Sequence, residues 1–276
     1  MRFSGSKAFS DAFAIFTSRF GRMAAVAVIY FVAVIAVFAL LGAGLAAQIA
    51  GGMMSPEAMS GGMVGAIVLI YILVYALQFA QQAALCRICS DRHDASIGDA
   101  IATGVRCVPT LFGVVILLII GFFVVGLVAS MVMAGAAAGA QSPGLAIVLG
   151  LLMFVGFGYL GTRISMILPV VAIDEVRNPI SAIATAWRIS GGHVLKLFLT
   201  YVLAMIVMGA IMLALFFLTI GIPSPGAVPG MGGIIAFGVG MLVAALSIGL
   251  YFTALVVAIH RQLSGVPTET ITDTFA

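Results

Sequence analysis

The side chain with the most unusual placement in this sequence is Arg163, which lies inside an apolar run of about residues 144–168. A guanidinium at mid-bilayer depth costs roughly 2.5–3.5 kcal/mol. If the helix continued to Asp174, Arg163 would lie about 16 Å from that end, although Pro169 could bend or stop the helix sooner. Two interpretations follow. The side chain snorkels to the cytoplasmic surface, or it faces the bundle interior and holds an anion such as a lipid phosphate.

Three glutamines form the second candidate group. Gln78, Gln81 and Gln82 occur at positions i, i+3 and i+4, which places them on one face of a helix. In the repeat alignment given below, Gln81 is the counterpart of Arg163. Polar residues at equal depth in two repeats are expected to face a shared interior rather than lipid. We therefore predict a ligand site formed by Arg163 and the three glutamines, with interhelical hydrogen bonding for stability as the alternative role of the glutamines.

The other reactive residue types form no catalytic or metal-binding pattern. Cys86 and Cys89 spell CxxC, but without a second pair or a βαβ context they are interpreted as small apolar residues at a helix end. Asp174 and Glu175 are adjacent on a turn and point apart, which disfavours acid–base catalysis by the pair. The histidines, which show no metal-ligand spacing, are His93, His193 and His260. We predict no enzyme activity, no cofactor and no bound metal.

The elements that position these residues are membrane-spanning helices. Apolar residues make up 63 % of the 276 residues, charged residues only 8 %, and the mean hydropathy is +1.29, which excludes an ordinary soluble protein. A helix needs about 20 apolar residues to cross the bilayer core. The runs that satisfy this length are about 23–47, 64–88, 109–136, 144–168, 194–221 and 232–259. We predict an all-α integral membrane protein with six transmembrane helices in one membrane domain, residues 1–276.

Basic residues indicate the orientation of the chain. All 12 Lys and Arg residues fall on one side of the six-span topology. Positive charge is translocated reluctantly, so this side is expected to be cytoplasmic, with both termini in the cytoplasm and the chain in the bacterial inner membrane. The net charge of +3 is then explained by topology and by neighbouring lipid headgroups, and no nucleic-acid partner is predicted.

An internal repeat is the third feature of the sequence. A short amphipathic segment precedes each pair of apolar runs. Aligning these segments on Ala12, Ala100 and Ala182 places Arg19, Arg106 and Arg188 six or seven residues later. The predicted repeats cover about residues 1–90, 91–176 and 177–276, each with an amphipathic helix and a transmembrane hairpin.

The amphipathic segments are predicted to lie in the membrane interface. Phenylalanines spaced by 4, 3 and 4 residues give the first segment an aromatic stripe of Phe9, Phe13, Phe16 and Phe20. In the third segment, Asn178 is the expected N-cap and Trp187 contributes to the apolar face. Each segment has about 12–15 residues, too few to span the bilayer, and is basic at its end. They either anchor the hairpins or take part in gating or lipid access.

One stretch carries a resemblance to a known family. It reads Arg163-Ile-Ser, then Leu168-Pro-Val-Val-Ala-Ile-Asp-Glu175, Asn178-Pro-Ile-Ser-Ala182 and Trp187-Arg-Ile-Ser-Gly-Gly192. This pattern resembles the bacterial membrane proteins grouped with the glycerophosphoryl diester phosphodiesterase membrane domain and the YciC-like inner-membrane proteins. The resemblance implies the same layout of amphipathic helix and hairpin. It implies no enzyme, because the phosphodiesterase activity of that group belongs to a separate soluble domain that this sequence does not contain.

These observations favour a non-enzymatic, lipid- or envelope-related function: binding, moving or organising lipid or another apolar ligand. Membrane lipids are the expected partners. A small-solute transporter is one alternative, although no acidic residue lies within a predicted span for ion coupling. A structural subunit that contacts another envelope protein is the other. A ligand-binding protein predicts a cavity lined by the second and fourth spans with Arg163 inside.

Overall fold

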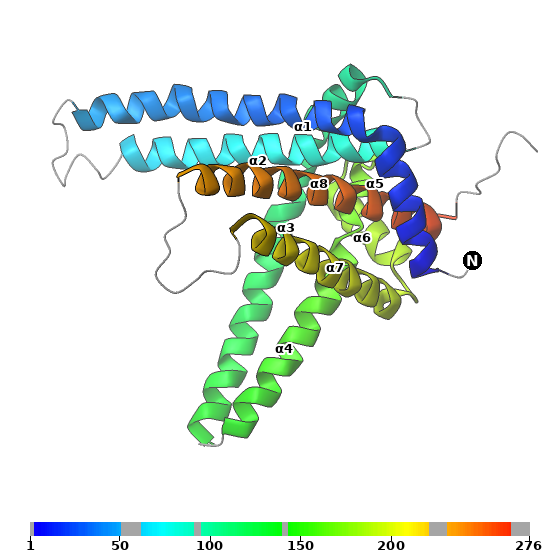
Figure 1. Cartoon of the computed structure of the whole chain (residues 1–276). Coiled ribbons are helices and arrows are strands. Elements are labelled where there is room, and N and C mark those ends of the chain that lie inside the picture. Colours follow the sequence, from blue (N-terminus) through cyan, green and yellow to red (C-terminus); the bar gives the residue numbers. More distant parts are fainter. Residues whose placement is uncertain (1–2, 51–61, 91–94, 140–142, 221–230, 266–276) are drawn as a thin grey trace, which may run out of the picture. The chain divides into compact units, whose positions relative to one another are not determined.

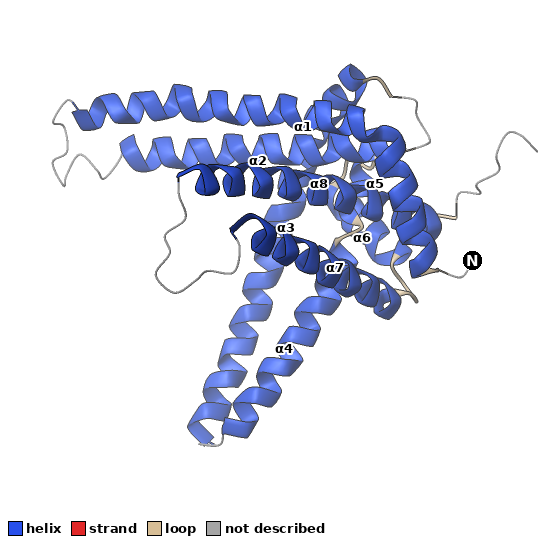
Figure 2. Cartoon of the chain, in the orientation of Figure 1, coloured by secondary structure: helices blue, strands red, loops and turns tan. Residues whose placement is uncertain are grey.

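The computed structural model describes residues 3–50, 62–90, 95–139, 143–220 and 231–265. These residues form eight helices and no strand (Figures 1 and 2). The helices are α1 (Gly5–Ala50), α2 (Gly62–Cys89), α3 (Ile97–Gly139), α4 (Pro143–Ile164), α5 (Ile167–Ala172), α6 (Pro179–Ile189), α7 (Val194–Ile220) and α8 (Met231–Leu263).

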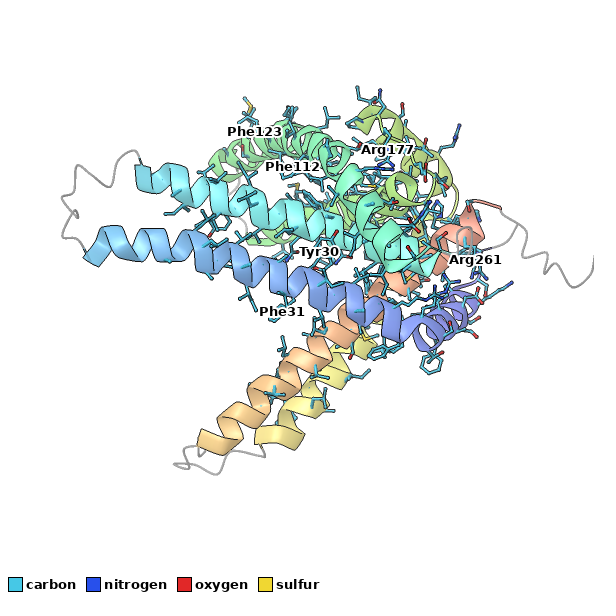
Figure 3. All side chains as sticks on the ribbon, turned by 90° about the horizontal axis from the view of Figure 1, so that it is seen from above. Tyr30, Phe31, Phe112, Phe123, Arg177 and Arg261 are labelled. Carbon is cyan, nitrogen blue, oxygen red and sulfur yellow. The ribbon has the colours of Figure 1, made fainter. Side chains whose placement is uncertain are left out.

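Six segments of these helices are long and apolar enough to cross a membrane, which confirms the predicted fold class. They are Gly5–Gly44, Val64–Cys89, Ile97–Met131, Gly150–Ala172, Val194–Phe217 and Phe237–Leu263. Large apolar side chains on them are exposed: Phe31 is 46 % and Phe123 69 % accessible, and both project from their helices in Figure 3. Such exposure is expected where the surrounding solvent is lipid.

The predicted interfacial helices are separate from the spans only in the third copy. In the first two copies, the amphipathic segment continues directly into the span, giving helices of 46 and 43 residues. In the third copy, α6 has 11 residues and ends before Gly192, whose φ of 77° is the left-handed conformation that terminates helices. The first segment has a single glycine, Gly21, and α3 contains Pro109 without ending there. The threefold repeat itself remains a prediction.

The fourth span is interrupted where the sequence allowed it to continue. Helix α4 ends at Ile164, and the short helix α5 begins three residues later. The ring of Pro169 would clash with the carbonyl of Ser165 in a continuous helix. The Ser165 hydroxyl instead donates to the Thr162 carbonyl at 2.7 Å, a local bond that competes with the helix. Arg163 is therefore in the last turn of α4, not inside a helix that reaches Asp174.

The chain divides into two compact units. The first comprises Met1–Ser18, Ile120–Ile167 and Ile183–Ala276, and the second comprises Arg19–Ile119 and Leu168–Ala182. In the first unit, α7 packs on α8, and the residues from Thr253 to His260 are buried without interruption. The backbone N–H of Ser4, just before α1, donates to the Gln262 side chain near the end of α8 at 3.3 Å.

In the second unit, small residues allow a close approach of α2 and α3. Ala80, Ala83 and Ala84 of α2 are buried, and Gly104 of α3 faces them. A β-carbon at position 104 would overlap the carbonyl oxygen of Ala80. The buried part of α1 in this unit includes Met23, whose Sδ lies 3.6 Å from the Sγ of Cys89. Transmembrane helices pack through such small residues because lipid gives no hydrophobic drive for association.

Candidate functional site

Arg163 lies between two aromatic rings of the first unit. Its guanidinium carbon is 5.2 Å from the ring centroid of Tyr159 and 4.8 Å from that of Trp187. Tyr159 is one turn earlier on α4, and Trp187 is near the end of α6. The two rings meet edge to face, with centroids 6.2 Å apart. A cation held against two rings is stabilised by roughly 0.5–2 kcal/mol for each contact, depending on how far it is desolvated.

The guanidinium also caps the C-terminus of α6. Nη1 donates to the carbonyl of Trp187 at 2.6 Å and contacts the Ser190 hydroxyl at 3.5 Å. Nε and Nη2 donate to the hydroxyl of Tyr159 at 3.2 and 2.8 Å. The last four carbonyls of a helix lack intrahelical partners, and a cation there also interacts favourably with the helix dipole. Arg163 thus ties the end of α4 to the end of α6.

The local sequence fixes both ends of α6 at the positions that this contact needs. The side-chain oxygen of Asn178 accepts hydrogen bonds from the backbone N–H groups of Ile180 at 2.9 Å and Ser181 at 3.3 Å. This confirms Asn178 as the predicted N-cap. At the other end, Ser190 is buried and its hydroxyl donates to the Ala186 carbonyl at 2.8 Å. The chain then turns at Gly192, so the Trp187 carbonyl remains available to Arg163.

The positive charge of Arg163 is not neutralised by a carboxylate in the part of the chain that the structure describes. A guanidinium has five N–H groups. Four of the five have the acceptors named above, which leaves one N–H of Nη2. The rings beside it are accessible, with 42 % of Tyr159 and 42 % of Trp187 exposed. The site can therefore accept an anion with an apolar body.

The predicted glutamines lie on α2, in the second unit, whereas Arg163 belongs to the first. Gln78 is exposed, and Gln81 and Gln82 are half-buried. The structure describes these two groups separately, so a joint site of Arg163 and the glutamines remains a prediction. The contacts of Arg163 with Tyr159 and Trp187 were not predicted, although Tyr159 is four residues before Arg163 on the same helix face.

The predicted interfacial residues have mixed environments. In the aromatic stripe, Phe13 and Phe20 are exposed, while Phe16 packs edge to face on Tyr251 with centroids 5.9 Å apart. Phe9 is half-buried, and its carbonyl lies 3.5 Å from the Tyr251 hydroxyl. Among the aligned arginines, Arg106 and Arg188 are exposed, but Arg19 is half-buried and donates to the Ile88 and Ser90 carbonyls at the end of α2. The aligned arginines therefore do not share one environment.

A charged cluster in the second unit was not predicted as a site. Nη1 of Arg87, in the last turn of α2, lies 3.0 Å from Oε1 of Glu175. Two residues beyond Glu175, Nη1 of Arg177 lies 3.3 Å from the Sγ of Cys107, a buried thiol of α3. The sequence analysis placed Asp174 and Glu175 on a turn. The available signal was that Arg87, like Arg163, ends a long apolar helix.

No family model, curated protein or solved structure matches this chain. Within the described residues, no three His, Cys, Asp or Glu side chains converge on a possible metal position. The three cysteines are buried thiols. The clusters around Arg163 and Arg87 each contain a guanidinium at a helix end. Guanidinium groups in proteins commonly bind oxyanions.

Proposed function

We propose that the protein is a non-enzymatic polytopic protein of the bacterial inner membrane that binds anionic phospholipid through Arg163. The observation that carries this proposal is the guanidinium in the last turn of α4, held between Tyr159 and Trp187 without a carboxylate partner in the described chain. A lipid phosphate is the anion that a membrane supplies most abundantly. It would accept a hydrogen bond from the remaining N–H of Nη2.

The positions of the aromatic rings support a headgroup ligand. Tyr and Trp side chains are enriched at the level of lipid headgroups, where one side of the ring is apolar and the other is wet. Here both rings lie against the cation and are partly exposed, so a bound lipid would contact them with its glycerol and upper acyl carbons. The distribution of Lys and Arg along the spans favours an orientation in which these helix ends, and both termini, are cytoplasmic. Anionic lipids of that leaflet attract basic residues near its surface.

Membership of the YciC-like group stays part of this proposal. The Arg163, the Pro169 turn, the Asn178 cap and the Trp187 that carried the resemblance are the residues that build or position the proposed site. The motif would then describe a headgroup-binding element and not a catalytic one.

The test is to identify the lipids that co-purify with the full chain in mild detergent. We expect the Arg163→Gln variant to retain about tenfold less anionic phospholipid than the wild type, because one charge-assisted hydrogen bond contributes roughly 1.5 kcal/mol or more. Arg188→Gln is the matched control, since Arg188 is exposed at the end of α6, the helix that Arg163 caps, and its loss removes the same charge. Equal lipid retention by the wild type and Arg163→Gln would reject the proposal and favour an envelope-protein partner.

A further inference from the structure

Arg87 of the second unit is a buried cation with incomplete hydrogen bonding. Only 12 % of its side chain is exposed. Its Nε and Nη1 atoms are buried, and neither makes an aligned hydrogen bond within the described chain. Nη1 does lie 3.0 Å from Glu175, so the two charges attract each other although the hydrogen-bond geometry is poor. Buried guanidinium groups are normally satisfied by oxygen acceptors, so Arg87 has capacity for a further one.

Glu175, whose carboxylate faces Arg87, has an unusual backbone conformation. Glu175 has a φ of 56°, and no other non-glycine residue that the structure describes has a positive φ. Its side chain is 51 % exposed. The turn around it is held on both sides, since the N–H of Ile173 donates to the Pro169 carbonyl at 2.7 Å and the Thr110 hydroxyl donates to the Arg177 carbonyl at 2.8 Å. Strained residues of this kind gather at ligand-binding and switching positions.

A second guanidinium lies beside the same pair. Nη1 of Arg177 is directed at the Cys107 thiol, which is a weak hydrogen-bond acceptor. Arg177 follows Glu175 by two residues, and Glu175 lies 3.0 Å from Arg87, so both guanidinium groups are found at one short turn. Asp174, the neighbouring carboxylate, has an interaction of its own. In the described chain, Arg87 thus has Glu175 as its carboxylate partner, and the guanidinium of Arg177 is directed at a thiol and not at a carboxylate.

We propose that Arg87 and Arg177 form a binding site for a phosphate group, and that Glu175 forms an ion pair with Arg87 until a phosphate displaces the carboxylate. The planar fork of a guanidinium matches the oxygens of a phosphate and binds them in pairs. Because Glu175 is half exposed, it can leave without unpacking the buried residues of the second unit. The phosphate is a monoester or diester, carried by a lipid headgroup or free in solution. This site is independent of the function proposed for Arg163.

The test uses the full chain in an uncharged detergent, titrated with inorganic phosphate in one arm and with short-chain phosphatidic acid in the other. Binding is followed as the increase in the apparent Tm, with chloride added to equal ionic strength as the blank. We expect Glu175→Gln to bind phosphate about 3–10-fold more tightly than the wild type, because the competing carboxylate is gone. We expect Arg87→Gln to bind at least tenfold more weakly.

The outcomes separate the two sources and the two proposals. Protection by inorganic phosphate indicates a soluble ligand, and protection only by phosphatidic acid indicates a headgroup. The phosphatidic acid arm is run in the Arg163→Gln background, which removes the lipid site proposed at Arg163, so a failure of the lipid proposal does not affect this test. If Arg87→Gln does not fold, Arg177→Gln, whose side chain is exposed, replaces it. A Glu175→Gln variant that binds neither ligand more tightly than the wild type would overturn the proposal, since Glu175 would then be a structural partner of Arg87 alone.

Discussion

Replacing Arg19 by methionine is expected to lower the apparent Tm of the full chain by roughly 6–12 °C, which corresponds to about 3 kcal/mol. The reason is the end of α2. Nη1 of Arg19 donates to the carbonyl of Ile88 at 2.6 Å and to that of Ser90 at 2.8 Å. Ser90 is buried, with 3 % of its surface exposed, so no solvent molecule easily replaces the lost donor. Methionine keeps the length and apolar volume of the arginine stem and removes only the charged group.

The measurement is thermal unfolding of the purified chain in detergent, followed by circular dichroism. Arg106→Met is the matched control, because Arg106 is the counterpart of Arg19 in the repeat alignment but is exposed. In the described chain, no hydrogen bond or ion pair joins the Arg106 side chain to another residue. The control should change the Tm by less than about 2 °C, as is usual for an exposed surface position. Equal losses in the two variants would show that charge near the membrane, and not the cap on α2, sets the effect.

Hydropathy and run length were sufficient to predict the six spans, because crossing the bilayer requires about 20 apolar residues in each. They were not sufficient to place the helix ends. The first two amphipathic segments were expected to be separate helices. Neither Gly21 nor Pro109 ends the helix, so α1 and α3 continue into their spans. The left-handed residue that follows α6, Gly192, has no counterpart near Gly21 or Pro109 in the described chain. Whether a glycine or a proline ends a helix also depends on the packing of the flanking segments, which the local sequence does not encode.

For the candidate residues, too, contacts within one helix could be predicted from the sequence, whereas contacts between distant segments could not. Arg163 was identified because a charge in an apolar run is costly, and Tyr159 could have been added from its spacing on the same helix. Trp187 is 24 residues away in the sequence, and it contacts Arg163 only because the segment between α4 and α6 folds back. The pairing of Arg87 with Glu175 is also non-local. The local sequence of the turn therefore gave no indication that Glu175 has a buried partner.

The structure also changes how the basic residues should be interpreted. Counting Lys and Arg gives the orientation of the spans, but it treats each charge as equivalent. Arg19 and Arg163 both donate to carbonyls at the end of another helix, so each is part of the packing. Arg106 and Arg188 are exposed and contribute charge at the surface. Ligand binding is best sought at arginines that are held by packing and still have N–H groups without an acceptor, as Arg163 and Arg87 do.

The second large effect is expected at Gly104, where valine should lower the apparent Tm by roughly 6–12 °C, corresponding to about 3 kcal/mol of overpacking. A β-carbon there would overlap the backbone carbonyl of Ala80 and approach the β-carbon of Ala84 to 3.1 Å. A backbone carbonyl in a helix cannot rotate away as a flexible side chain can. Helices α2 and α3 would therefore have to separate, which would also disturb the neighbouring Cys107.

Gly121 provides the control for this prediction, because it is on the same helix and a β-carbon there meets no atom within 4 Å. Both substitutions carry the same change in helix propensity, so the difference between the two Tm values isolates the contact with α2. We expect Gly121→Val to change the Tm by less than about 2 °C. If the two valine variants unfold at the same temperature, close packing of α2 and α3 is not what requires glycine at position 104. If only Gly104→Val is destabilised, the second unit depends on this crossing, and the positions of Arg87 and Cys107 on the two helices depend on it as well.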